Sequence, residues 1–300
     1  MKINNYWHFL KIGSLFGMLG FVGACEVINP EEPIPAYLYV TDVQFVAEPF
    51  SEGSDSEKIT EVWLSVSGDF LGAYAVPALI PLLEFGEQTI TISAGIKDNG
   101  ISNTPEIYPF YKGFTFDRNL QPNVIDTIRP IFRYSDQAKF AFIEDFEGST
   151  SVFQVVRIGD QDQFSISNED PFEGNASGLI TLDSVNTIFE IATEIRYDQL
   201  KEVGTAIYLE LNYKSDVPVV FGLVGYNEGD FPSEGIILLD PGFFPSEDWN
   251  KIYFNLTENI FELNKDEYQI ALQAFIPFEN GQPSVKTAKV YLDNVKLLHF

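Results

Sequence analysis

The chain has one cysteine and two histidines, and these shortages exclude most sites built on thiols or imidazoles. Cys25 is the single cysteine among 300 residues, so no second cysteine exists to form a disulfide within the chain. Of the histidines, His8 lies in an apolar-rich N-terminal stretch and His299 is the second-last residue. Catalytic triads with a histidine base, and zinc sites with several histidines, need imidazoles held inside a cleft. The sequence argues against both classes of site.

Basic residues are also scarce. The chain has 18 Lys and Arg residues against 44 Asp and Glu residues, which gives a net charge of −26. Proteins that bind nucleic acid neutralise phosphates with clustered Lys and Arg side chains, so we expect no nucleic-acid partner. A strongly acidic surface suits solubility and the binding of divalent cations.

Long stretches with helical spacing of apolar residues are missing from residue 37 onward. Short runs rich in Val, Ile, Tyr and Phe occur instead, for example at 38–46, 60–66 and 88–93, and Gly, Pro, Asp or Ser residues bound them. Alternating runs of this length are typical of β-strands. The sequence therefore predicts an all-β protein.

The N-terminal segment has the organisation of a secretory signal. Residues 1–11 carry lysines and no acid, and residues 12–24 are uncharged and mostly apolar. This apolar run is shorter than the roughly 20 residues that a membrane-spanning helix needs. We predict a signal peptide over 1–24, followed by an acidic, proline-rich linker over 25–36.

The end of this segment, Val22-Gly23-Ala24-Cys25, resembles the lipobox of bacterial lipoproteins. The resemblance implies that Cys25 is acylated and attaches the protein to a membrane; the alternative is an ordinary signal peptide that contains a cysteine. Glu26, Glu31 and Glu32 loosely resemble the export signal of Bacteroidota-type lipoproteins. That resemblance implies an outer-membrane lipoprotein at the cell surface, and the alternative is a plain solvated linker.

A boundary near 135–139 divides the rest of the chain into two expected domains. In the first, 37–134, a strand at 62–66, a Gly-Asp turn, Pro77 and an alternating strand at 89–95 follow one another. This order resembles PEGA-like and related small immunoglobulin-like sandwich modules. The resemblance implies a spacer or a platform for protein contacts.

The second expected domain, 138–300, has signature segments at both ends. It opens with Phe-Ile-Glu-Asp-Phe-Glu-Gly at 142–148 and closes with Val-Tyr-Leu-Asp-Asn-Val at 290–295, with a tryptophan-bearing strand at 248–257 between them. The order resembles the galactose-binding-like jelly roll of many carbohydrate-binding modules. We therefore predict a small immunoglobulin-like sandwich followed by a β-jelly roll, and the resemblance implies glycan recognition.

The same resemblance implies a structural calcium ion. In such jelly rolls the first and last strands lie close together and their acids often hold Ca²⁺, and the matching positions are Asp145, Glu147 and Asp293. Calcium accepts carboxylate and carbonyl oxygens in irregular geometry. The alternative is a solvated strand edge, with Asp293 and Asn294 as turn residues. The acidic loop 159–163 lacks the later ligands of a calcium loop, and we interpret it as a turn.

The stretch 226–249 is a candidate sugar platform. Aromatic faces stack on the apolar face of a sugar, while amides and acids bind its hydroxyl groups. The candidate ligand-binding residues are Tyr226, Asn227, Phe231 and Phe244. The alternative is packing in the core, because the chain contains 27 phenylalanines.

Catalysis on a sugar would need two carboxylates about 5 to 10 Å apart across the bond to be cleaved. Glu144-Asp145-Phe146-Glu147 lacks the spacing of the jelly-roll glucanase signature. We predict a non-catalytic envelope lipoprotein that recognises a glycan. The alternative is a structural or adhesive lipoprotein that binds a protein partner in an envelope assembly.

Overall fold

The computed structural model describes residues 33–103, 105–201 and 206–300. The predicted signal peptide, Cys25 and most of the linker lie outside these residues. Strands make up 56% of the described residues and helices 6%, which confirms the predicted all-β class. Among the described residues, no helix is both long and apolar enough to span a membrane.

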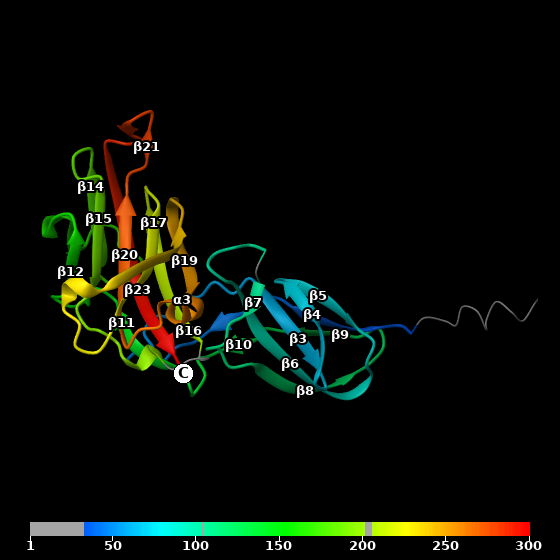
Figure 1. The fold of residues 1–300 in the computed structure, drawn as a ribbon. Helices are drawn as coiled ribbons and strands as arrows, with labels where there is room; N and C mark the ends of the chain where they lie inside the picture. Colours follow the sequence, from blue (N-terminus) through cyan, green and yellow to red (C-terminus); the bar gives the residue numbers. More distant parts are fainter. Residues whose placement is uncertain (1–32, 104, 202–205) are drawn as a thin grey trace, which may run out of the picture.

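The strands between residues 36 and 132 form the first of two strand groups (Figure 1). They build sheets in the orders β5-β1-β9, β10-β2 and β4-β3-β6-β7, and β8 pairs with β6. Their bounds are β1 Ala36–Val40, β2 Gln44–Phe45, β3 Glu61–Val66, β4 Asp69–Ala75, β5 Ala78–Leu82, β6 Gly86–Lys97, β7 Pro105–Ile107, β8 Phe114–Leu120, β9 Ile125–Ile128 and β10 Ile131–Phe132.

The residues of β3 and β4 explain why this hairpin forms. Val62, Leu64 and Val66 of β3 are buried, whereas the residues between them point away from the core. The turn is Ser67-Gly68, and both residues have positive φ values, 50° and 94°. Two consecutive positive φ values match the right-handed twist of a two-residue hairpin.

The strands between residues 139 and 299 form the second group, with two main sheets. We call them the β23 sheet, in the order β13-β14-β23-β16-β19 with β11 beside β23, and the β20 sheet, in the order β12-β15-β20-β17-β18. The strand bounds are β11 Lys139–Glu144, β12 Phe153–Ile158, β13 Phe164–Ser167, β14 Ser177–Asp183, β15 Ile188–Thr193, β16 Ile207–Ser215, β17 Val219–Tyr226, β18 Ile236–Phe243, β19 Ser246–Asn255, β20 Glu267–Phe275, β21 Phe278–Glu279, β22 Gln282–Pro283 and β23 Thr287–His299. The helices are α3 Thr257–Leu263 and the short 3-10 turns η1 Gln161–Gln163, η2 Gln199–Lys201 and η3 Pro232–Glu234.

These two sheets pack face to face over one apolar core. Phe189 and Leu272 of the β20 sheet belong to the same buried cluster as Phe254 and Leu292 of the β23 sheet. The first and last strands of the group, β11 and β23, pair antiparallel, with Lys139 opposite His299. This pairing confirms that the two segments with signature residues lie together.

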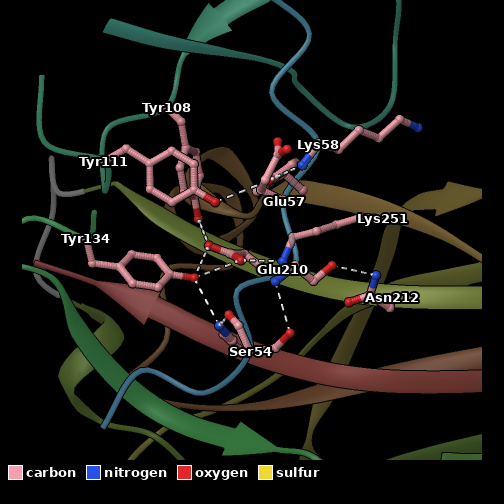
Figure 2. A network of polar contacts seen from close by, with 12 residues as sticks. Ser54, Glu57, Lys58, Tyr108, Tyr111, Tyr134, Glu210, Asn212 and Lys251 are labelled. Carbon is pink, nitrogen blue, oxygen red and sulfur yellow. Dashed lines mark hydrogen bonds and ion pairs between the residues drawn. The ribbon is translucent and has the colours of Figure 1, made fainter. Parts of the chain in front are cut away.

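The two strand groups meet at the buried carboxylate of Glu210 on β16 (Figure 2). Tyr108 donates a hydrogen bond to it at 2.7 Å and Tyr134 donates at 3.0 Å, both from the first group. Lys251 of β19 donates to it at 2.8 Å. Burial acts to raise the pKa of Glu210, but the ammonium groups of Lys251 and Lys296 and the hydrogen bonds hold that pKa below its ordinary value.

Further polar contacts surround this carboxylate. The hydroxyl groups of Tyr111 and Tyr253 lie 3.2 Å apart, and the backbone N–H of Lys58 donates to the Tyr253 hydroxyl at 2.9 Å. The Lys296 ammonium donates to the carbonyl of Ser54 at 2.8 Å. Because each contact joins residues of both strand groups, the junction holds the groups in a defined orientation.

Candidate functional site

The outer face of the β20 sheet carries polar side chains in an ordered arrangement. Alternation along β15 and β20 turns Phe189, Ile191 and Leu272 into the core. Glu190 and Gln273 lie between those core residues, so their side chains point to the opposite face. Figure 1 shows β12, β15, β20 and β17 of this sheet next to one another in the second group.

Three planar side chains form a polar row across this face. Arg157 of β12 donates through Nε to Oε1 of Glu190 at 2.8 Å. Gln273 of β20 donates through Nε2 to the other oxygen, Oε2, at 2.7 Å. The carboxylate therefore fixes both neighbours, while Arg157 keeps N–H groups, and Gln273 a carbonyl oxygen, outside these two bonds.

A row of small residues runs beside the polar row. The strand register places Val155, Ala192, Ala271, Gly222 and Leu239 in one line across all five strands. The three central positions are Ala, Ala and Gly, and they are buried: Ala192 and Ala271 are 0% exposed and pack with Val224 and Tyr226 in a small cluster on this face. The partly buried Val155, Ile237 and Leu239 pack against this cluster.

Tyr226, predicted to bind a ligand, lies at the end of β17 with its ring inside this face. It is 1% exposed, and its hydroxyl donates to Oε1 of Gln269 at 2.7 Å. The guanidinium of Arg196 lies over its ring, with Cζ 3.6 Å from the ring centroid. Tyr226 therefore follows the alternative of packing in the core, and Arg196 covers the ring face on which a sugar would stack.

The structure does not gather the other candidate sugar-binding residues into one platform. Asn227 donates to Asp230 and accepts a hydrogen bond from Lys265. Phe231 and Phe244 are 72% and 83% exposed, but they lie before the start and after the end of β18. An eight-residue strand is about 26 Å long, so one sugar cannot touch both rings. Ligand binding by either ring alone stays a prediction.

The predicted calcium ligands do not converge either. Strand β11 ends at Glu144, and Phe146 adopts a left-handed φ of 57°, so Asp145 and Glu147 lie in a turn and do not share a strand face. In the described part of the chain, no three His, Cys, Asp or Glu residues form a group that could hold a metal. Asp145, Glu147 and Asp293 therefore do not form the predicted group of calcium ligands.

Backbone N–H groups donate hydrogen bonds to two of the three predicted calcium ligands, Glu147 and Asp293. Glu147 accepts from the backbone of Asn175 at 2.6 Å and of Ala176 at 2.9 Å. Hydrogen bonds from the side chain and backbone of Asn175 lower the pKa of Glu147. Asp293 accepts from the backbone of Phe172 at 3.1 Å, and burial raises the pKa of Asp293 to about 7. Calcium binding itself stays a prediction.

A cleft of about 1000 Å³ lies at one end of the second group. The acidic loop 159–163, interpreted as a turn, contains the short helix η1 and borders this cleft. The other borders include Asp183, Asp216 and Lys289. No aromatic ring lines the cleft, so it lacks a surface on which a sugar could stack.

Sequence reasoning missed the polar row entirely. Arg157, Glu190 and Gln273 belong to three strands separated by more than thirty positions each, and no local motif joins them. The only sequence signal for the row was a charged or amide residue inside an otherwise apolar strand. The segment 188–193 has one such residue, Glu190. The register that aligns the three side chains is a property of the folded sheet.

No protein-family model and no curated protein matches the chain. Among solved structures, the chain is similar to the CBM22-1 xylan-binding domain from Paenibacillus barcinonensis Xyn10C, with 12% identity and a TM-score of 0.39, over 55% of this chain and 97% of that one. It is also similar to the family 30 carbohydrate-binding module of a cellulosomal cellulase of Clostridium thermocellum, with 12% identity and a TM-score of 0.35, over 53% and 96%. A third is TmCBM61, solved with β-1,4-galactotriose, with 12% identity and a TM-score of 0.32, over 51% and 93%. These neighbours are carbohydrate-binding modules, and at such TM-scores the likeness does not decide what this chain binds.

Proposed function

We propose that this protein recognises a glycan, without chemical change, on the outer face of the β20 sheet. The observation that carries the proposal is the polar row of Arg157, Glu190 and Gln273 on a face that also carries partly buried apolar residues. Sugar hydroxyl groups need planar donors and acceptors in fixed positions, whereas the C–H faces of a sugar need a flat apolar surface. The polar row supplies the planar groups, and Val155, Ile237 and Leu239 supply apolar side chains on the same face.

The energetics of the row also favour a binding role. The side chain of Glu190 is 5% exposed and that of Arg157 is 22% exposed, so both charges are partly removed from water. A buried ion pair often contributes less to stability than apolar residues of the same volume would. The sheet does not need an ion pair on its outer face in order to fold. Hydrogen bonding to a ligand would explain why this ion pair is present.

The proposal includes the cellular setting predicted from the sequence. Cys25 carries a lipid, and the protein is an outer-membrane lipoprotein displayed at the cell surface. The lipobox-like residues before Cys25 and the acids after it support this part of the proposal. The absence of catalysis belongs to the proposal as well.

A protein partner is the second candidate function, and one surface favours it. On the sheet β5-β1-β9 of the first group, Leu79 is 53% exposed and Ile125 is 57% exposed, and Tyr39 lies opposite Leu79. Exposed apolar side chains that cluster on one sheet face are typical of protein-contact surfaces. A structural or adhesive role would use this face.

A glycan array with the full-length protein tests the proposed function. We expect saturable binding to one class of glycan, and weaker binding by Arg157→Lys, because lysine keeps the charge but loses the planar set of donors. A loss of about tenfold corresponds to the energy of one good hydrogen bond to a charged group. Arg129→Lys is the matched control, because Arg129 forms an exposed ion pair with Asp42 in the first strand group.

Two results would contradict the proposal. Equal binding by the wild type and Arg157→Lys would place the glycan elsewhere, and the same array run with Phe231→Ala and Phe244→Ala would show whether those exposed rings hold it. A folded wild type that binds no glycan would favour the protein-partner function.

A further inference from the structure

Three lysines gather at one small pocket between the two strand groups. The pocket measures about 220 Å³ and is lined by Lys58, Thr60, Lys97, Gly100, Ser102, Lys251, Ile252 and Tyr253. None of these lining residues is acidic, although acids outnumber bases by 44 to 18 in the chain. The local charge of this pocket is therefore opposite to that of the molecule.

The pocket is built from both strand groups. Lys58 precedes β3 and Lys97 ends β6 in the first group, whereas Lys251 and Tyr253 lie on β19 of the second. The backbone N–H of Asn99 donates to the carbonyl of Tyr253 at 2.9 Å and holds the two sides together. A ligand in the pocket would contact both groups at once.

The three lysines differ in whether their ammonium groups pair with a carboxylate. Lys97 forms an ion pair with Glu61, and Lys251, whose side chain is 1% exposed, forms one with Glu210 at 2.8 Å. The ammonium of Lys58 donates to the neutral amide oxygen of Asn250 at 2.6 Å. Across the described residues, Lys58 has no carboxylate within ion-pair distance.

Two of the three lysines are therefore paired with carboxylates, and Lys58 is not. Burial lowers the pKa of Lys58, because part of its side chain is withdrawn from water. An anion in the pocket would offset the charge of Lys58 and accept hydrogen bonds from its ammonium group.

We propose that this pocket, which we call the lysine pocket, binds a small oxyanion, namely a sulfate ion or the carboxylate of an acidic sugar. Its volume holds one such group with its immediate substituents and is too small for an extended oligosaccharide. Lys58 provides the unmatched charge, and Lys97 and Ser102 line the pocket beside it. The bound anion ties the first strand group to the second.

Thermal melting of the full-length protein tests this site. The protein is melted with sodium sulfate, sodium glucuronate or glucose, at an ionic strength kept constant with sodium chloride. We expect a higher melting temperature with glucuronate than with glucose, and with sulfate than with chloride alone. Sulfate without glucuronate would identify the source as a free inorganic ion, and glucuronate would identify a sugar carboxylate; either supports the site.

Matched variants separate specific binding from the general stabilisation that sulfate gives to folded proteins. Lys58→Met removes the charge and keeps the length of the side chain, and Lys58→Arg keeps the charge. Lys286→Met, at an exposed lysine far along the chain in the loop before β23, is the control. We expect titration calorimetry to show at least about tenfold weaker anion binding in Lys58→Met only.

The proposal is overturned if Lys58→Met shows the same anion-dependent shift as the wild type and Lys286→Met, or if no anion shifts the wild type. This outcome is independent of glycan recognition on the β20 sheet, because no residue of the lysine pocket belongs to that face.

Discussion

Glu210 is a carboxylate that the fold surrounds completely, and each of its partners compensates for its removal from water. Tyr108, Tyr134 and Lys251 all direct donors at it. Removing one partner of a buried charge leaves a desolvation cost that nothing offsets, so such losses exceed those of surface contacts. The hydrogen bonds to Glu210 therefore help to hold the two strand groups together.

The variant Tyr108→Phe tests this link, because it removes a single hydroxyl and keeps the ring. Hydrogen bonds to charged groups contribute about 1.5–3 kcal/mol, so we expect the free energy of unfolding to fall by about that amount. Urea denaturation measures it. The control Tyr39→Phe removes a hydroxyl from a partly exposed ring, and we expect a change within about 0.5 kcal/mol. Equal effects of the two substitutions would show that the Glu210 contacts do not stabilise the fold.

Single residues were also where prediction from sequence failed. Asp145 and Glu147 were predicted to act together as calcium ligands, but Phe146 between them turns the backbone into the left-handed region. Tyr226 was a candidate ligand-binding residue, but it is 1% exposed and Arg196, thirty positions earlier, covers its ring. Both outcomes depend on local dihedral angles or distant partners that a pattern of residue types does not contain.

At the scale of elements, alternation predicted the strands well but not their register. The alternating segment 89–95 lies within β6, and the opening and closing signatures of the second group lie on paired strands. The alignment of Arg157, Glu190 and Gln273 depends on bulges and pairings among β12, β15 and β20. A shift of one residue would turn these side chains into the core, so the register decides whether the face exists.

The edge of the β20 sheet depends on Gly222 of β17. A Cβ atom there would lie 1.9 Å from the carbonyl oxygen of Leu238 on the paired strand β18. We expect Gly222→Ala to lower the free energy of unfolding by about 1–3 kcal/mol, because the backbone must shift to admit the methyl group.

The matched control is Gly113→Ala, where the nearest atom would lie at an ordinary contact distance of 3.5 Å. We expect a change within about 0.5 kcal/mol for this control. Thermal melting of both variants measures the difference, and a Gly222→Ala variant as stable as Gly113→Ala would show that β18 is not tightly paired there.

At the scale of the whole molecule, the two strand groups share a buried core. Tyr208, Tyr253 and Leu298 of the second group pack in the same apolar cluster as residues of the first. Glycan recognition on the β20 sheet would therefore be held in a fixed orientation relative to the first group. The sequence predicted the all-β class but not this joint, because the joint consists of contacts between residues such as Tyr108 and Glu210 that lie far apart in the chain.

Titration calorimetry of Gln273→Leu with the oligosaccharide selected on the array tests the central claim most directly. The substitution removes the amide of the polar row and keeps a side chain of similar size; Gln282→Leu, at an exposed glutamine in β22, is the control. We predict that Gln273→Leu binds about 2- to 10-fold more weakly than the wild type, the effect of one hydrogen bond, while Gln282→Leu binds equally well. Unchanged affinity in a folded Gln273→Leu variant would contradict glycan recognition on the outer face of the β20 sheet.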